Sequence, residues 1–210
     1  MKEADVQAAS MGYFQRRTSC ATAMSRVFAV CGMPGSGKGE FAALLEQNGI
    51  PNVSMGDMIR KEVKHRGLEE SPMIFGQIAS ELRSEFGPQV LADRLVDAVN
   101  ELMETNAIVL IEGMRGTDEY DVFMSEWGQS FSTIAIETDT EIRFERIQSR
   151  GRSEDGDRAA FDVRNQRESS WGLESLIQDA DVIFNNDKTI EEFSTTVNAW
   201  LNEISDANES

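Results

Sequence analysis

A glycine-rich segment with one lysine carries the clearest chemical signal in the chain. It reads GMPGSGKGE and fits the P-loop pattern G-x-x-x-x-G-K, with Gly32, Gly37 and Lys38 in register. In loops of this pattern, backbone N–H groups surround the phosphates of a nucleotide and the lysine reaches the β and γ phosphates. The segment therefore predicts a phosphate site, and the residues expected to bind the nucleotide are Gly32, Met33, Pro34, Gly35, Ser36, Gly37, Lys38, Gly39 and Glu40.

The residue after the lysine departs from the usual pattern. A Ser or Thr normally stands there, and its hydroxyl ligates magnesium beside the phosphates, whereas this chain has Gly39. We expect magnesium to be held instead through waters on Glu112 and Asp57. The alternative for the whole segment is a glycine-rich turn with a solvated lysine. An apolar run before it and a helical pattern after it favour the phosphate site, because phosphates bind where such a loop enters a helix.

Arginines gather in one later segment of an otherwise acidic chain. Residues 143–167 contain seven arginines against five acids, a net charge of +2 within a chain of −17. Arg143, Arg146 and Arg150 are spaced by three and four residues, so one helix face presents them together. Because a planar guanidinium suits phosphate oxygens, Arg146 and Arg150 are expected to act on the transferred phosphoryl group. Arg164, taken singly, is more typical of a solvated, ion-paired surface.

Two carboxylates, Glu112 and Asp57, are candidates for binding a metal or accepting a proton. Glu112 follows the most apolar strand signal in the chain, residues 107–111. A charge at the end of a buried strand needs a partner, which favours water-mediated magnesium over a purely structural carboxylate. Asp57 leaves three alternatives open: a helix N-cap, a base that accepts a proton from a hydroxyl substrate, or a magnesium ligand through water.

The elements that position these residues follow from the apolar periodicity. Strands are expected at 27–31, 52–55, 107–111, 131–136 and 181–184. Helices are expected up to Asn48-Gly49 and then at 57–66, 72–86, 90–104, 118–127, 140–149, a segment ending near Ser169, and 190–204.

This alternation predicts an α/β fold with a mainly parallel sheet. Ligands in such folds bind at the carboxyl ends of the strands, so the glycine-rich loop should meet Asp57, Arg60, Glu112, Arg115 and the arginines of residues 143–152 at one rim. Three consecutive helices between the second and third strands exceed a simple crossover. We therefore expect a helical insert between those strands, at residues 56–105.

Composition and charge narrow the class of protein. The 210 residues suffice for one well-packed domain, expected at 25–206 between a flexible leader, 1–24, and a tail, 207–210. The net charge of −17 argues against nucleic acid and anionic membranes as partners, since both attract basic surfaces. No apolar run approaches the roughly 20 residues of a membrane span, which favours a cytoplasmic protein. The ratio of 15 Arg to 5 Lys beside 37 acids resembles proteins of salt-loving cells.

Four segments resemble, in order, those of adenylate kinases and related nucleoside monophosphate kinases: residues 32–39, 54–60, 112–115, and 145–147 with Arg150. Adenylate kinases also follow the loop lysine with glycine. More closely, residues 26–204 look like an archaeal family of adenylate-kinase-like proteins often labelled dephospho-CoA-kinase-like. The matching pieces are GMPGSGK, SMGDMIR, EGMRG, RFERIQSRGR and ADVIFNN.

The resemblance implies a P-loop NTPase three-layer fold with a five-stranded, mainly parallel sheet. It implies that the helical insert binds the acceptor and that a short lid, residues 151–168, closes over ATP. On this resemblance Arg60 and Arg115 hold the acceptor phosphate. Arg146 and Arg150 hold the phosphates during the transfer. Met55 stands where adenylate kinases have Thr, and residues 112–115 are one residue shorter than their counterpart, so the acceptor stays open.

We expect a kinase that uses ATP and Mg²⁺ to phosphorylate a small nucleotide-like molecule, either on a phosphate or, with Asp57 as base, on a hydroxyl. The alternative is a nucleotide-dependent switch or slow ATPase that binds a protein partner. A monomer and a homodimer are both open. The expected catalytic residues are Lys38, Arg115, Arg146, Arg150 and Asp57, and the expected substrate-binding residues are Asp57, Arg60 and Arg115.

Overall fold

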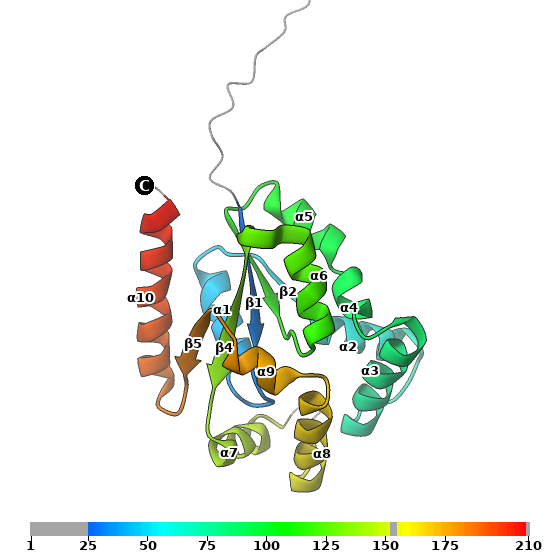
Figure 1. The fold of residues 1–210 in the computed structure, drawn as a ribbon. Helices are drawn as coiled ribbons and strands as arrows, with labels where there is room; N and C mark the ends of the chain where they lie inside the picture. The colour runs from blue at the N-terminus through cyan, green and yellow to red at the C-terminus, as the bar shows by residue number, and fades with distance from the viewer. Residues whose placement is uncertain (1–24, 152–154, 209–210) are drawn as a thin grey trace, which may run out of the picture.

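Five parallel strands form the central sheet of the computed structural model, which describes residues 25–151 and 155–208 (Figure 1). Each neighbouring pair of strands is parallel. The predicted α/β fold with a five-stranded parallel sheet is confirmed. In spatial order the strands are β2 (Asn52–Ser54), β3 (Ile108–Glu112), β1 (Arg26–Cys31), β4 (Phe131–Glu137) and β5 (Val182–Asn185).

Helices connect the strands and cover both faces of the sheet (Figure 1). Parallel strands require such crossovers, because each new strand must start again at the same edge. The helices are α1 (Lys38–Gln47), α2 (Met55–His65), α3 (Pro72–Phe86), α4 (Val90–Asp93), α5 (Val96–Met103), α6 (Thr117–Trp127), α7 (Thr140–Arg150), α8 (Arg158–Ser169), α9 (Leu173–Gln178) and α10 (Ile190–Asn208), with a short 3₁₀ turn η1 (Gly128–Ser130) before β4.

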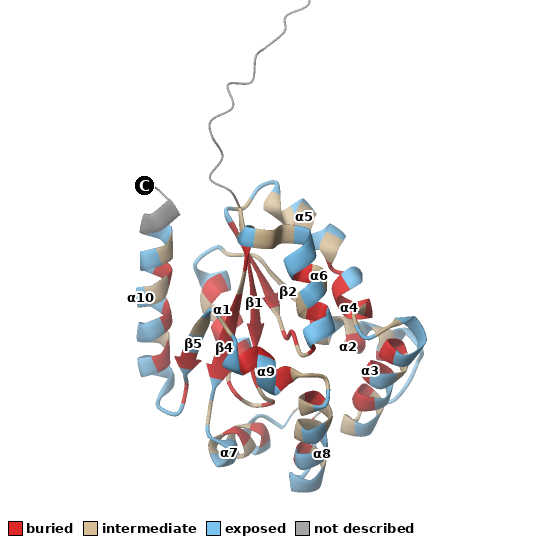
Figure 2. Cartoon of the chain, in the orientation of Figure 1, coloured by how far each residue is buried: buried red, intermediate tan, exposed pale blue. Residues whose placement is uncertain are grey.

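The central strand β1 faces two separate hydrophobic cores. Val27, Ala29 and Cys31 pack into the core beneath the helices α2 to α6 and α9, whereas Phe28 and Val30 pack into the core beneath α1 and α10. Figure 2 shows the buried residues concentrated along the strands and the inner faces of these helices. The uninterrupted apolar run of β1 is the pattern of a strand that is buried on both sides.

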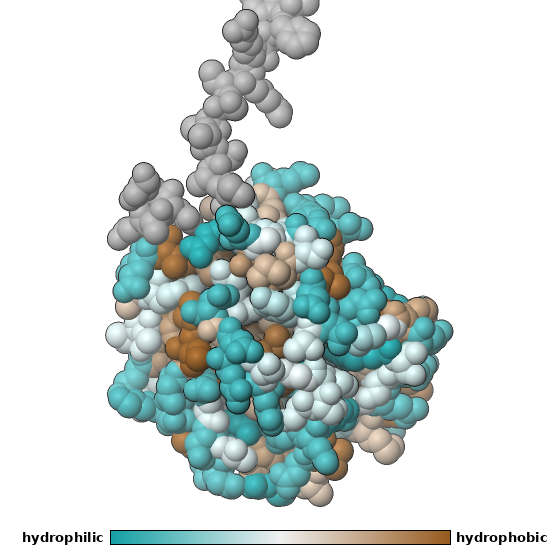
Figure 3. All heavy atoms as spheres, in the orientation of Figure 1, coloured by the Kyte–Doolittle hydropathy of each residue, from teal (hydrophilic) through white to brown (hydrophobic). Residues whose placement is uncertain are grey.

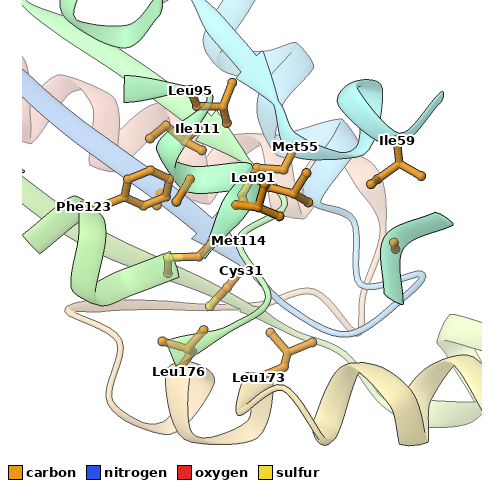
Figure 4. Close-up of a cluster of buried hydrophobic side chains, with 14 of the residues drawn as sticks. Cys31, Met55, Ile59, Leu91, Leu95, Ile111, Met114, Phe123, Leu173 and Leu176 are labelled. Carbon is orange, nitrogen blue, oxygen red and sulfur yellow. The ribbon is translucent and has the colours of Figure 1, made fainter. Parts of the chain in front are cut away.

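Cys31, the last residue of β1, lies among the side chains of Met114, Leu173 and Leu176 (Figure 4). It is fully buried, and burial raises the pKa of its thiol to about 12. At neutral pH the thiol is therefore protonated, and the residue serves as a small member of the core.

The predicted helix at 90–104 is two helices, α4 and α5. The chain tightens at Leu95, whose backbone N–H donates to the carbonyl of Ala92, three residues back. Such a bond ends an α-helical turn. The apolar period continues across this break, because Leu91, Leu95 and Val99 are all buried. Periodicity alone therefore could not reveal it.

Two further boundaries differ from prediction. Met55 starts α2 instead of ending a strand, because the Ser54 hydroxyl caps the helix by accepting from the N–H of Asp57 at 3.3 Å. Helix α9 was missed, since its six residues are too few to establish a helical period. It buries Leu173, Leu176 and Ile177 beside β4.

Four helices, α2 to α5, lie between β2 and β3, at the position of the predicted insert. The helices α7 and α8 lie beyond the carboxyl ends of the strands, where the predicted lid begins (Figure 1). The predicted leader, 1–24, lies outside the described residues, as do lid residues 152–154. Helix α10 continues to Asn208, past the predicted domain end.

The surface in Figure 3 is mostly hydrophilic, with apolar residues in scattered patches. None of the helices in the described part of the chain is long and apolar enough to cross a membrane.

Candidate functional site

The loop between β1 and α1 is held in shape by side chains from distant parts of the chain. Arg143 of α7 donates from Nη1 to the carbonyl of Pro34 at 3.0 Å, and Asn186 after β5 donates from Nδ2 to the carbonyl of Ser36 at 2.9 Å. Gly37 has a φ of +105°, and a Cβ there would lie 2.2 Å from the Asn186 amide nitrogen. Only glycine fits this position, because a side chain would have neither the backbone conformation nor the space.

Lys38 begins α1 and folds back over the loop. Its Nζ donates to the carbonyl of Gly32 at 2.5 Å and to that of Met33 at 3.0 Å. Burial lowers the pKa of the lysine to about 8, although the negative charge of Glu168 opposes this shift. The ammonium is thus held at the loop by two backbone carbonyls.

A cavity of about 920 Å³ lies in front of the loop. Its wall combines the loop with parts of α2, the turn after β3, α7, α8 and the turn after β5. This volume is within the usual range for small-molecule sites. The predicted site residues that line it are Pro34, Gly35, Gly37, Lys38, Gly39, Glu40, Arg60, Glu112, Arg115, Arg146 and Arg150, whereas Gly32, Met33, Ser36 and Asp57 are absent from its lining.

The three arginines of α7 have different environments. Arg146 donates from Nη2 to the carbonyl of Lys188 at 3.3 Å, and its buried Nη1 has no hydrogen-bond partner within the described residues. Arg150 is held by both carboxylate oxygens of Asp155, at 2.7 and 2.6 Å. Unlike Arg146 and Arg150, Arg143 does not line the cavity. It is buried beneath the loop, where its hydrogen bonds make it a structural support.

Asp57 and Arg60 form an exposed ion pair on the first turns of α2. Because Ser54 supplies the cap, the interpretation of Asp57 as the N-cap is wrong. Arg60 reaches the cavity wall, but the structure does not bring Asp57 to it.

Glu112 is the acidic side chain from the sheet that reaches the cavity wall. Within the described ranges no group of three or more His, Cys, Asp or Glu could hold a metal by itself. Mg²⁺ at nucleotide sites is usually bound by one or two carboxylates together with substrate phosphates. Glu112 fits that pattern, because it lies close enough to Lys38 for its charge to raise the lysine pKa.

Glu168 on α8 is a site residue that the sequence analysis missed. Its Oε2 accepts from Arg115 Nε at 3.1 Å, and its Oε1 accepts from Arg164 Nε at 2.9 Å. Burial by itself would raise the pKa of this carboxyl, but the charges of Arg115, Arg164 and Lys38 outweigh it and hold the pKa at about 2. The ionised carboxylate therefore orients two arginines that line the cavity. The spacing of Arg164 and Glu168 was an available signal, but it is equally typical of a surface pair.

The depressed pKa of Glu168 predicts how stability depends on pH. The group stabilises the fold above its ordinary pKa of 4.5, and that contribution is lost as the pH falls from 4.5 toward 2. We expect Glu168→Gln to have a lower free energy of unfolding than wild type at pH 7. The difference should shrink through this window, as measured by urea denaturation at a series of pH values.

Glu101→Gln, which removes an exposed carboxylate from α5, is the matched control and should show a much smaller difference at pH 7. An equal and pH-independent loss in both variants would contradict the assigned role of Glu168.

Comparisons with known proteins identify the families to which the chain belongs. A family model described as an AAA domain matches residues 31–160. A UPF0200 protein of Methanosarcina acetivorans is 38% identical over 180 residues, covering 85% of this chain and 95% of the relative. A UPF0200 protein of Methanoregula boonei is 44% identical over 172 residues, covering 81% and 93%.

Two solved structures share the fold. Dephospho-CoA kinase from Campylobacter jejuni has a TM-score of 0.57 and 17% identity, over 88% of this chain and 100% of that one. Shikimate kinase from Bacteroides thetaiotaomicron has a TM-score of 0.52 and 19% identity, over 85% and 98%. The chain thus has a P-loop kinase-like fold.

Proposed function

The chain belongs to the UPF0200 family, and its residues 31–160 to the AAA domain family, and we propose that it is an ATP-dependent kinase for a small, nucleotide-like acceptor. One observation supports this most: a single cavity joins the phosphate loop to arginines from four different elements. A nucleotide switch needs only the side with the loop. Arginines on the opposite wall suit a second, negatively charged reactant and the charge that develops during phosphoryl transfer.

The proposed roles follow from where each side chain lies. Lys38 and the loop amides bind the β and γ phosphates of the donor. Arg146 and Arg150 extend from α7 into the same cavity and stabilise the transferred group as charge spreads over its oxygens. Arg115, held in orientation by Glu168, faces them from the turn after β3 and positions the acceptor.

Magnesium, when bound, neutralises charge on the phosphate oxygens, and Glu112 would hold it through water. Asp57 is not needed for that role. Its exposed pairing with Arg60 leaves it as a candidate base only if closure of the insert carries it into the cavity.

The acceptor is open between a phosphate and a hydroxyl. We expect that Mg-ATP and the correct acceptor together release ADP much faster than Mg-ATP alone. The measurement follows ADP in molar KCl with nucleoside monophosphates, dephospho-CoA and shikimate as acceptors, the last two because kinases of these compounds share the fold. A rate of ADP release that no acceptor changes would instead support a slow ATPase or a switch that binds a protein partner.

A further inference from the structure

A smaller cavity of about 60 Å³ extends the main one between the insert and α8. The two cavities share Gly56, Arg60, Arg115 and Arg164 in their walls. The smaller one adds apolar residues of α2 and α3, the Trp171 side chain, Arg167 and the Glu168 carboxylate. One water needs roughly 10 to 15 Å³ on this measure, so the space accommodates one phosphate-sized or carboxylate-sized group and excludes a whole nucleoside.

The arginines around this cavity differ in how their charges are balanced. Arg60 pairs with Asp57, while Arg115 and Arg164 share Glu168. Arg167 makes no ion pair within the described part of the chain, and its buried Nε has no hydrogen-bond partner there. Glu168 also lines this cavity, but its two carboxylate oxygens already accept from Arg115 and Arg164. The cavity therefore keeps positive charge at Arg167, and a ligand with a negative group would compensate it.

The position of the Arg167 guanidinium depends on a glycine of another helix. A Cβ at Gly76, in the second turn of α3, would lie 2.2 Å from Arg167 Nη1 and 2.8 Å from its Cζ. The guanidinium also lies over the Trp171 ring, with Cζ at 5.8 Å from the ring centroid. Glycine destabilises the interior of a helix relative to alanine. Its presence here is explained by the space that the guanidinium occupies.

We propose that Arg167 binds an anionic group of the acceptor in the smaller cavity, and that this group is remote from the atom that receives the phosphoryl group. Arg167 lines only the smaller cavity, whereas Lys38, Arg146 and Arg150 line the main one. An anion bound at Arg167 therefore anchors the acceptor while another group faces the donor. The acceptor class is a small molecule with a phosphate or carboxylate separate from its reacting oxygen. This inference rests on the proposed kinase function.

The test measures binding of inorganic phosphate by calorimetry to the full chain saturated with Mg²⁺ and AMP-PNP, so that the phosphate loop is already filled. We expect Arg167→Ala to weaken phosphate binding at least tenfold. Gly76→Ala should do the same without removing any charge, because its methyl group displaces the guanidinium. Its melting temperature should equal or exceed that of wild type, which separates loss of binding from loss of folding.

Arg158→Ala is the matched control, since it removes an arginine from the same helix whose partners are the exposed acids Glu141 and Asp162. It should bind phosphate as wild type does, and all variants should bind AMP-PNP within about twofold of wild type. Wild-type affinity for phosphate in Arg167→Ala, or no phosphate binding by the nucleotide-filled wild type, would overturn the anion site. Absence of AMP-PNP binding would contradict the proposed function itself.

Dephospho-CoA and shikimate, titrated under the same conditions, distinguish a phosphate anchor from a carboxylate anchor. If the affinity for dephospho-CoA falls at least tenfold in both Arg167→Ala and Gly76→Ala, the anchored group is a phosphate. If the affinity for shikimate falls in this way, it is a carboxylate. If either compound binds and its affinity is the same in all variants, the assignment of its anion to Arg167 is wrong.

Discussion

Replacement of Lys38 by methionine is expected to lower kcat for phosphoryl transfer by roughly 100- to 1,000-fold. The methionine keeps most of the volume of the side chain but removes the ammonium, which lies at the phosphate loop on the carbonyls of Gly32 and Met33. The loop amides alone would then oppose the charge that develops on the donor phosphates. The measurement is steady-state ADP release with the acceptor found in the panel.

The pH dependence of wild type gives an independent readout of the same side chain. Burial lowers the pKa of Lys38 to about 8 in the ligand-free protein, so the ammonium loses its proton as the pH rises through that value. We expect kcat/KM for ATP to fall above about pH 8. Lys64→Met, which alters an exposed lysine of α2, should change neither kcat nor this profile. A Lys38→Met enzyme within threefold of wild type would disprove the role of the lysine.

Replacement of Glu119 by glutamine is expected to lower the free energy of unfolding by about 3 to 5 kcal/mol. Glu119 is fully buried, and its Oε1 accepts from Arg83 Nη2 at 2.6 Å. Its Oε2 accepts from the backbone N–H groups of Arg115 at 2.7 Å and Gly116 at 3.1 Å. Glutamine can still accept from the backbone but leaves the charge of Arg83 buried without a counter-charge. Chemical denaturation measures the loss.

A second substitution tests this explanation. Arg83 is 8% exposed and lies over the Trp171 ring, with Cζ at 4.1 Å from the centroid. In the double variant Arg83→Met/Glu119→Gln the unpaired charge is gone, so most of the lost stability should return. Glu62→Gln, which removes one partner of an exposed pair with Arg66, should stay close to wild type. A double variant less stable than Glu119→Gln alone would contradict the account.

The phosphate loop and its place in the fold could be predicted from the sequence. Gly32, Gly37 and Lys38 form a contiguous pattern, and the apolar run of β1 precedes it directly. The loop and the strand each depend on residues that are neighbours in the sequence, so short-range conformational preference and burial suffice to specify them. The same holds for α3, whose predicted bounds match the structure, because Ser71 caps it and Gly87 ends it.

The opposite wall of the cavity could be predicted only in part. Arg146 and Arg150 have the spacing of one helix face, and both line the cavity. Arg143 has the same spacing but is buried under the loop. Helical period places three arginines on one side of α7, but the packing of Arg143 against the Pro34 carbonyl decides which of them reach the cavity.

Two buried charge pairs were decided by tertiary structure alone. Arg115 and Glu168 are separated by 53 residues, and Arg83 and Glu119 by 36. Nothing in the local sequence distinguishes these charges from those of a solvated surface. Sequence spacing determines which side chains share a face of one element, because it acts through backbone geometry. Which faces then meet, and which charges become buried together, depends on how the helices of the insert pack against α6 and α8.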